Sequence, residues 1–348
     1  MKRSWIALLV VAVFFSRASS QVDRSIPEKD KPSQLKAQNR ISVTSEKVGI
    51  ISGSTKCDSQ GNVYFREYEV DRPHLSPVIN ITVKGERKAI FAPSAFTNPP
   101  LTDVAYFNIS PGGDLYWPGF AADRKAIYVV SFNKDGSPKS EVKLDQEFIP
   151  FQFAAFKSGE LLLAGVKLDD PSVAGTERPF TAIFSSSGKL LKRFSLQDDD
   201  YIMQAAKRGD VSVVSPVNPT VIRALNLGEA ASSDDGNVYL LRHLSPAIIY
   251  AISPAGNVVR RISLETPGGL MPIAMQASRD SLALVFWDND TETGTVKVLD
   301  SGTGRETASY AYGDPLGPAF ACFRSQPDAF SFLTGNKETL VLVHAAAH

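Results

Sequence analysis

Short segments along most of the chain alternate apolar and polar positions, as in residues 127–130 and 258–262. This period of two predicts half-buried β-strands, and it excludes helical repeats, whose apolar residues recur every three or four positions. Polar turns that contain glycine separate the segments. The pattern therefore predicts an all-β protein built from many short strands.

One unit recurs six times in the chain: a tight polar turn followed at once by a β-branched or aromatic run. These turns are centred at residues 61, 113, 159, 236, 280 and 328, so the intervals are 44 to 52 residues except for one of 77. Two turns per unit imply two hairpins and hence four strands. The second turn falls inside five of the units, at Gly85, Gly136, Gly188, Gly256 and Gly302.

A four-stranded unit of this length, repeated six times, is typical of propeller blades. We therefore predict one domain over residues 40–348, a six-bladed β-propeller of four-stranded antiparallel blades with a long insert at about 197–227. The last unit supplies only three strands. An N-terminal strand at about 40–45 is expected to join this C-terminal blade and close the ring, which removes exposed sheet edges.

Two turn phrases resemble those of NHL-type and related secreted six-bladed propellers: Asp-Ser-Gln-Gly-Asn-Val-Tyr at 58–64 and Ser-Asp-Asp-Gly-Asn-Val-Tyr at 233–239. The resemblance covers residues 40–348 and implies the fold. The Asn-His-Leu tripeptide that names the group is absent from the sequence, and no functional residue is carried over. Some propellers of this appearance are lactonases or lyases, which assemble Ca²⁺ or a general base from carboxylates, Asn and His around the channel.

The strands expected to line the channel contain only two acids, Asp103 and Glu229. Ca²⁺ takes six to eight oxygen ligands, several of them carboxylate, so the sequence disfavours a calcium site. Four histidines and two cysteines show no metal-ligand spacing, and no phosphate-binding or dinucleotide-binding glycine loop occurs. We expect no metal, no cofactor and no assignable catalytic residue. An enzyme of the lactonase, lyase or esterase kind stays open as an alternative, with Asp103, Glu229 and His243 as its candidates.

Residues 1–20 combine a basic start, an apolar run from Trp5 to Phe15 and a small-residue end, which predicts a signal peptide. The run is too short to span a membrane, although Arg17 near the cleavage region keeps an uncleaved anchor open. Residues 21–39 are polar and contain prolines, so we expect a disordered leader. The protein is expected to be exported, periplasmic or extracellular, with no membrane span in the mature chain.

The two cysteines, Cys57 and Cys322, fall at similar places in the innermost strands of the first and sixth units. Those units become neighbours when the ring closes, and an oxidising destination permits a disulfide. Two free thiols remain the alternative, because neighbouring strands can exceed the roughly 7 Å Cα separation that a disulfide spans.

Charge narrows the choice of partners. The chain has 37 basic and 37 acidic residues, and this balance gives no positive footprint for nucleic acid. All short turns share one face of a propeller, whereas the long connections share the other, and binding residues concentrate on loops held by rigid scaffolds. A protein or small-ligand partner is therefore expected at the long-loop face. Its candidate residues are Asp198, Asp199, Asp200, Tyr201, Lys207, Arg208, His74 and His243.

The two histidines occur in the same tetrapeptide, His-Leu-Ser-Pro, at 74–77 and 243–246. They belong to opposite blades and cannot share one metal ion, whose ligands must each lie about 2 Å from it. We expect a binding or scaffold module with an unidentified partner. The alternatives are the enzyme described above and a subunit of an envelope assembly tethered by residues 21–39.

Overall fold

A computed structural model describes residues 32–43, 51–69, 71–104, 106–121, 126–168, 177–200, 204, 227–244, 246–335 and 339–348. Strands dominate these residues, and the prediction of an all-β protein is confirmed. Short 3₁₀ helices lie at Pro73–Leu75 (η2), Pro93–Ala95 (η3) and Pro267–Gly269 (η4). Among the described residues, no helix has the length and apolar character needed to cross a membrane.

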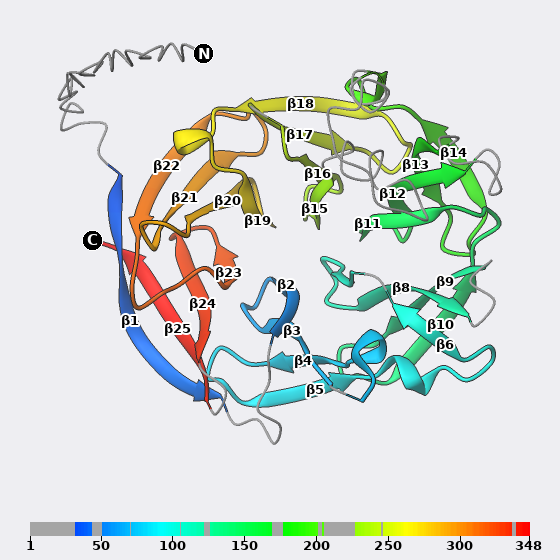
Figure 1. The fold of residues 1–348 in the computed structure, drawn as a ribbon, viewed down its shortest axis with the longest axis horizontal. Helices are drawn as coiled ribbons and strands as arrows, with labels where there is room; N and C mark the ends of the chain where they lie inside the picture. The colour runs from blue at the N-terminus through cyan, green and yellow to red at the C-terminus, as the bar shows by residue number, and fades with distance from the viewer. Residues whose placement is uncertain are drawn as a thin grey trace, which may run out of the picture. The chain divides into compact units, whose positions relative to one another are not determined.

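Four separate sheets follow one another in sequence order around a central axis (Figure 1). Three of them have four strands, and the second has five because its innermost strand is divided in two. The first holds β2 (Ile51–Cys57), β3 (Val63–Glu67), β4 (Val78–Ile81) and β5 (Arg87–Phe91). The second holds β6 (Leu101–Val104), β7 (Asn108–Ile109), β8 (Leu115–Ala121), β9 (Ile127–Phe132) and β10 (Pro138–Lys143), with β6 and β7 both paired to β8. The third holds β11 (Ile149–Ala155), β12 (Leu161–Leu168), β13 (Glu177–Phe184) and β14 (Leu190–Phe194). The fourth holds β15 (Leu227–Ser232), β16 (Val238–Arg242), β17 (Ala247–Ile252) and β18 (Val258–Leu264).

The remaining strands form one eight-stranded sheet in the order β19-β20-β21-β22-β1-β25-β24-β23. Its strands are β19 (Pro272–Ser278), β20 (Ser281–Asp288), β21 (Thr293–Asp300), β22 (Glu306–Tyr312), β23 (Phe320–Arg324), β24 (Ala329–Gly335), β25 (Leu340–Ala347) and β1 (Ser33–Val43). The protein is therefore a β-propeller of four-stranded antiparallel sheets. The count of six separate blades is not met, because β1 pairs in parallel with β22 at two positions and merges two four-stranded halves.

The N-terminal strand closes the ring as predicted but begins earlier. β1 pairs antiparallel with β25 from Leu35↔Ala347 to Val43↔Leu340. Residues 33–39, expected in the disordered leader, are therefore part of a strand. The polar composition was misleading because β1 is held by main-chain pairing, while only Leu35 and Val43 are buried. Residues 1–31, including the expected signal peptide, lie outside the described residues.

The turns between strands explain the glycine pattern. Gly61 and Gly236 have φ of +83° and +88°, a left-handed conformation that glycine adopts without a steric penalty. Each turn is closed by a main-chain bond, from Gly61 N to the Asp58 carbonyl at 2.9 Å and from Gly236 N to the Ser233 carbonyl at 3.2 Å. These hairpin turns all lie on one face, here called the turn face. The longer connections lie on the opposite face, the connection face.

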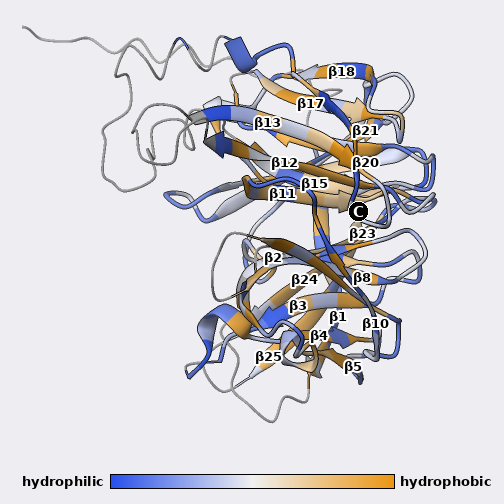
Figure 2. Ribbon diagram, turned by 90° about the vertical axis from the view of Figure 1, so that its right-hand side faces the viewer, coloured by the Kyte–Doolittle hydropathy of each residue, from blue (hydrophilic) through white to orange (hydrophobic). Residues whose placement is uncertain are grey.

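Apolar side chains pack between neighbouring sheets. Figure 2 shows hydrophobic residues along many of the strands. Middle strands β16 and β17 are buried at every position because both of their surfaces are covered. Outer strand β18 is mostly exposed. Clusters of this kind join each sheet to the next, for example Tyr64 and Phe91 of the first sheet with Trp117 of the second.

Candidate functional site

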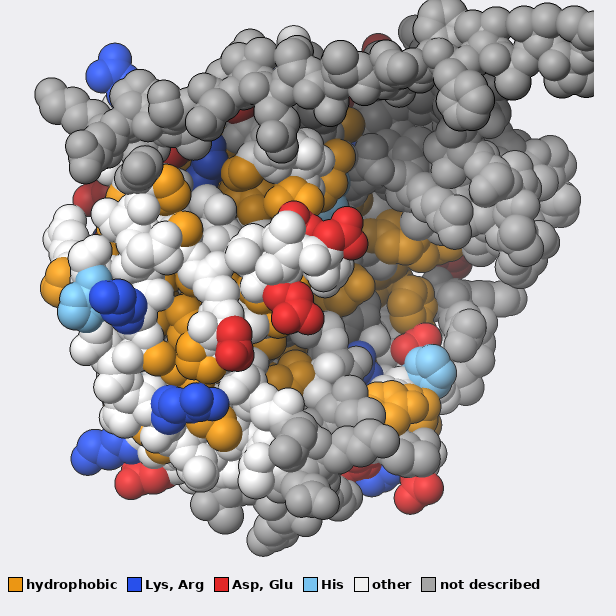
Figure 3. All heavy atoms as spheres, turned by 60° about the vertical axis from the view of Figure 1, so that its left-hand side comes forward, with side chains coloured by type: hydrophobic (Ala, Val, Ile, Leu, Met, Phe, Trp, Pro, Cys, Tyr) orange, Lys and Arg blue, Asp and Glu red, His pale blue; other side chains and the backbone are white. Residues whose placement is uncertain are grey.

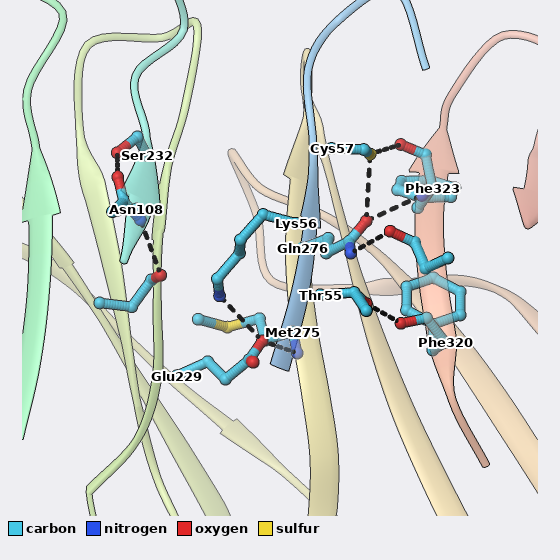
Figure 4. A network of polar contacts seen from close by, with 12 residues as sticks. Thr55, Lys56, Cys57, Asn108, Glu229, Ser232, Met275, Gln276, Phe320 and Phe323 are labelled. Atoms are coloured by element: carbon cyan, nitrogen blue, oxygen red, sulfur yellow. Dashed lines mark hydrogen bonds and ion pairs between the residues drawn. The ribbon is translucent and has the colours of Figure 1, made fainter. Parts of the chain in front are cut away.

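The innermost strands are linked to one another around the axis (Figure 4). Cys57 of β2 and Cys322 of β23 form a disulfide, with their Cα atoms 5.3 Å apart. Thr55 of β2 also donates a hydrogen bond to the Phe320 carbonyl of β23. The first sheet is therefore joined to the last part of the eight-stranded sheet at the axis. At the outer edge, the N-terminal strand β1 pairs with the C-terminal strand β25.

Two amides make similar links between other inner strands. Gln276 of β19 donates to the Ala321 carbonyl at 3.0 Å and accepts from Phe323 N at 2.8 Å. Asn108 of β7 accepts from the Ser232 hydroxyl at 2.8 Å. These buried amides satisfy main-chain and hydroxyl groups where the strands converge, so they fix the spacing of the sheets.

An ion pair crosses the axis below these amides. Lys56 Nζ of the first sheet lies 3.2 Å from Glu229 Oε2 of the fourth, and both side chains are about nine-tenths buried. The same oxygen accepts a hydrogen bond from Met275 N at 2.9 Å. The other carboxylate oxygen, Oε1, is buried and has no hydrogen-bond partner among the described residues. Burying the Glu229 carboxylate as an ion would be costly without an opposite charge beside it, and Lys56 supplies that charge.

His243 follows β16 at the connection face and lies close to Glu229. Burial lowers the pKa of His243, against opposing effects from the Glu229 charge and a hydrogen bond to the Pro272 backbone. Glycine at 228 leaves room for the ring, because a Cβ there would lie 2.6 Å from His243 Nε2. The neutral imidazole is therefore favoured.

A cavity of about 460 Å³ opens at the turn face, around the axis. Its lining includes the buried residues Ile109 and Phe323 together with Cys57 of the disulfide. Serine side chains contribute hydroxyl groups, and charged side chains lie at the rim. The serines are Ser59, Ser110, Ser232, Ser278 and Ser325, and the charged residues are Asp58, Asp234, Arg279 and Arg324.

The charged residues at the rim differ in how many hydrogen bonds they make within the protein. Asp58 accepts hydrogen bonds from Gln60 N at 2.9 Å and from Asn62 N at 3.0 Å, and also from the Tyr64 hydroxyl at 3.3 Å. Burial first, and then the Asp58 charge, raise the pKa of Tyr64. Arg279 donates to Gln326 Oε1 at 3.0 Å, while its side chain stays exposed. Asp58 thus stabilises its own turn, whereas Arg279 faces the cavity mouth.

The three aspartates expected at the connection face have different environments. Asp199 is only 6% exposed and forms an ion pair with Arg242, so it belongs to the interior rather than to a solvent-facing set. Asp198 accepts a hydrogen bond from the Tyr250 hydroxyl. Asp200 is exposed. The other members of the set, Tyr201, Lys207 and Arg208, lie outside the described residues, as does most of the expected insert.

The remaining candidates form one further pair. His74 Nδ1 lies 3.5 Å from Asp103 Oδ1, and 69% of the His74 side chain is exposed. This separation is longer than the roughly 2.7–3.2 Å that is typical of a hydrogen bond from a ring nitrogen to an oxygen. Single acidic and basic side chains are interspersed with apolar and uncharged groups on the described surface visible in Figure 3, consistent with the balanced composition.

Sequence reasoning missed the polar residues that matter most at the axis, namely Lys56, Asn108 and Gln276. A search for acids alone could not find them, although each is a polar residue in a strand expected to be innermost. It also missed Arg279, because the two-residue turn that carries it lacks the glycine that four other inner turns place at positive φ. A polar residue at a buried, axis-facing strand position was the available signal.

No protein-family model matches this sequence, and no curated protein matches it. Among solved structures, the chain is similar to virginiamycin B lyase from Staphylococcus aureus, with 14% identity, a TM-score of 0.47, and coverage of 88% of this chain and 87% of that one. It is also similar to the PQQ-bound aldose sugar dehydrogenase from Streptomyces coelicolor, with 10% identity, a TM-score of 0.49, and coverage of 91% and 100%. At such identities and TM-scores, neither structure bears on what this chain binds.

Proposed function

We propose that this protein is an exported binding module that takes a small polar ligand in the cavity at the turn face. The observation that carries this proposal is the 460 Å³ cavity itself, whose lining combines apolar side chains with hydroxyl and charged groups. Such a mixture is typical of ligand sites, where apolar contacts supply affinity and a few polar groups fix orientation.

The scaffold around the cavity supports a binding role. A disulfide, two buried amides and one buried ion pair hold the inner strands. A cavity wall fixed in this way loses little conformational freedom when a ligand enters. The entropic cost of binding is therefore smaller, and more of the contact energy contributes to affinity.

The architecture belongs to the same proposal. We take the two halves of the eight-stranded sheet as two blades, which makes six blades with the four separate sheets, in the manner of NHL-type secreted propellers. The disulfide between Cys57 and Cys322 supports export, since such bonds persist in oxidising compartments.

A thermal-shift screen of the purified protein tests the binding role. The probes are monosaccharides, sugar acids, amino acids and dipeptides, each measured with the wild type and with Ser59→Trp. Ser59 is exposed in its turn and lines the cavity, so an indole there fills the mouth without disturbing the core. At least one probe should raise Tm in the wild type and have no effect on Ser59→Trp. A shift that survives in Ser59→Trp would place binding elsewhere.

One observation favours an enzyme as the second candidate. The Glu229 carboxylate is buried beside Lys56 and near His243, and its Oε1 has no hydrogen-bond partner among the described residues. A buried carboxylate is the kind of group that serves as a general base in hydrolases and lyases. Hydrolysis of γ- and δ-lactones by the wild type, lost in Glu229→Gln with the fold intact, is the expected result for this alternative.

A further inference from the structure

We infer that the ligand of the turn-face cavity carries a carboxylate or a similar oxyanion beside hydroxyl groups, and that Arg279 binds the anion. This inference rests on the proposed binding role of the cavity. It is carried by the backbone of Arg279, by the placement of its guanidinium and by the charges of the rim.

The backbone conformation of Arg279 is unfavourable for a side chain other than glycine. Its φ is +52°, in the two-residue turn between β19 and β20, where Ser278 pairs with Ser281. Four other inner turns place glycine at positive φ instead: Gly61, Gly113, Gly159 and Gly236. An arginine here has a conformational cost that glycine would avoid. Outliers of this kind cluster at binding sites, where the side chain is needed at that position.

The Arg279 guanidinium is also positioned. Its Nη1 donates to Gln326 Oε1 at 3.0 Å, and Gln326 itself has a φ of +64°. Among the described residues, only Arg279, Gln326 and Glu292 are non-glycine residues with positive φ, and the first two line the cavity. Two unfavourable backbone positions therefore converge on one hydrogen bond at the cavity mouth. That bond uses one of five guanidinium N–H groups and leaves the fork able to bind a carboxylate through two parallel hydrogen bonds.

The rim next to Arg279 suits an anion with neighbouring hydroxyl groups. Arg324, on the adjacent turn, adds a second positive charge and lies against Gly61. Asp58 is already bonded within its turn, so its carboxylate competes little for Arg324. On the other side, exposed Asp234 offers an acceptor for ligand hydroxyl groups, as Ser59 does.

Isothermal titration calorimetry of the purified mature protein with D-glucuronate and D-glucose tests this inference. The two sugars differ only at C6, which is a carboxylate in glucuronate and a hydroxymethyl group in glucose. Wild-type protein should bind glucuronate at least about 10-fold more tightly than glucose, as expected for charge-assisted hydrogen bonds. Arg279→Gly should remove this preference and leave glucose affinity within about 2-fold, while Tm stays the same or rises, because glycine suits the positive φ. Inorganic sulfate should compete with glucuronate in the wild type only.

Arg305→Gln is the matched control, since Arg305 is exposed on the same face but does not line the cavity. It should bind both sugars as the wild type does. If both sugars bind equally to the wild type and Arg279→Gly, and neither binds to Ser59→Trp, the anion inference is overturned and the cavity role stands. If neither sugar binds the wild type at millimolar concentration, the anion inference is overturned, and the cavity role is decided by the thermal-shift screen. If Ser59→Trp leaves binding unchanged, both proposals are overturned, because the ligand then binds outside the cavity.

Discussion

The two ends of the central axis are built from different kinds of chain. The turn end consists of short hairpin turns, closed by local bonds such as that between Gly61 N and the Asp58 carbonyl. The connection end has longer segments, among them the stretch between β14 and β15, where Asp199 lies. Loop length led us to expect the site at the connection end, whereas the 460 Å³ cavity lies at the turn end.

The difference shows that concavity in a ring of sheets does not depend on long loops. Inner turns from five positions around the axis contribute to one cavity, and four of them supply only two or three residues each. At the connection end, by contrast, part of the long segment serves the core, since Asp199 pairs with buried Arg242. Loop length identifies where variation is tolerated, but the arrangement of strands decides where a cavity forms.

Loss of the disulfide should have the largest effect on stability, and it acts at the turn end. Removing a crosslink between residues 265 positions apart should lower the free energy of unfolding by about 5 kcal/mol in the chain-entropy model. Urea denaturation of Cys57→Ala/Cys322→Ala against the wild type measures this loss. Alanine is preferred to serine because Cys322 is buried. Two free thiols in the denatured wild type, with no difference in stability, would show that the bond is not formed.

The next effect belongs to the connection end. Asp199→Ala should lower the free energy of unfolding by about 4 kcal/mol, because Arg242 is 1% exposed, loses its ion pair and cannot become neutral. Asp200→Ala is the control: its side chain is exposed and one residue away, so a change below about 0.5 kcal/mol is expected. Equal effects of the two substitutions would mean that the Asp199–Arg242 pair does not stabilise the fold.

Much of the fold could be predicted from the sequence because turn chemistry is local. Turn residues such as glycine, aspartate and serine located most of the innermost strands to within about two residues, as for Ile51–Cys57 and Pro272–Ser278. The start of β1 at Ser33 could not be predicted, since its pairing with β25 is between backbones and leaves little trace in side chains.

The site was harder to predict than the fold because its geometry is not local. Lys56 and Glu229 are far apart in the chain, and only the closed ring brings them to 3.2 Å. The role of Arg279 depends on a backbone φ that no sequence pattern gives. Conversely, Asp198 and Asp199 were expected at a binding face, and only the packing against β16 and β17 shows that Asp198 is bonded to Tyr250 and Asp199 to Arg242.

The Lys56–Glu229 pair lies between the two ends, and its loss should have a smaller effect than that of Asp199. Lys56→Met should lower the free energy of unfolding by about 3 kcal/mol, because Glu229 keeps its hydrogen bond to Met275 N and can take up a proton. The double variant Lys56→Met/Glu229→Leu should recover most of this loss, since no buried charge remains. A double variant no more stable than Lys56→Met would show that the pair adds net stability beyond its own desolvation.

The smallest expected effect is a change in the pH dependence of stability, and it arises at the connection end. Burial lowers the pKa of His243 below its ordinary value, so the unfolded chain takes up this proton at a higher pH than the folded protein. The stability that follows is present above about pH 6.5 and is lost as the pH falls, with a slope of at most about 1.4 kcal/mol per pH unit. His243→Gln should flatten the pH dependence of urea denaturation between pH 6.5 and 5. An unchanged slope in His243→Gln would show that acid sensitivity does not arise at this position of the connection end.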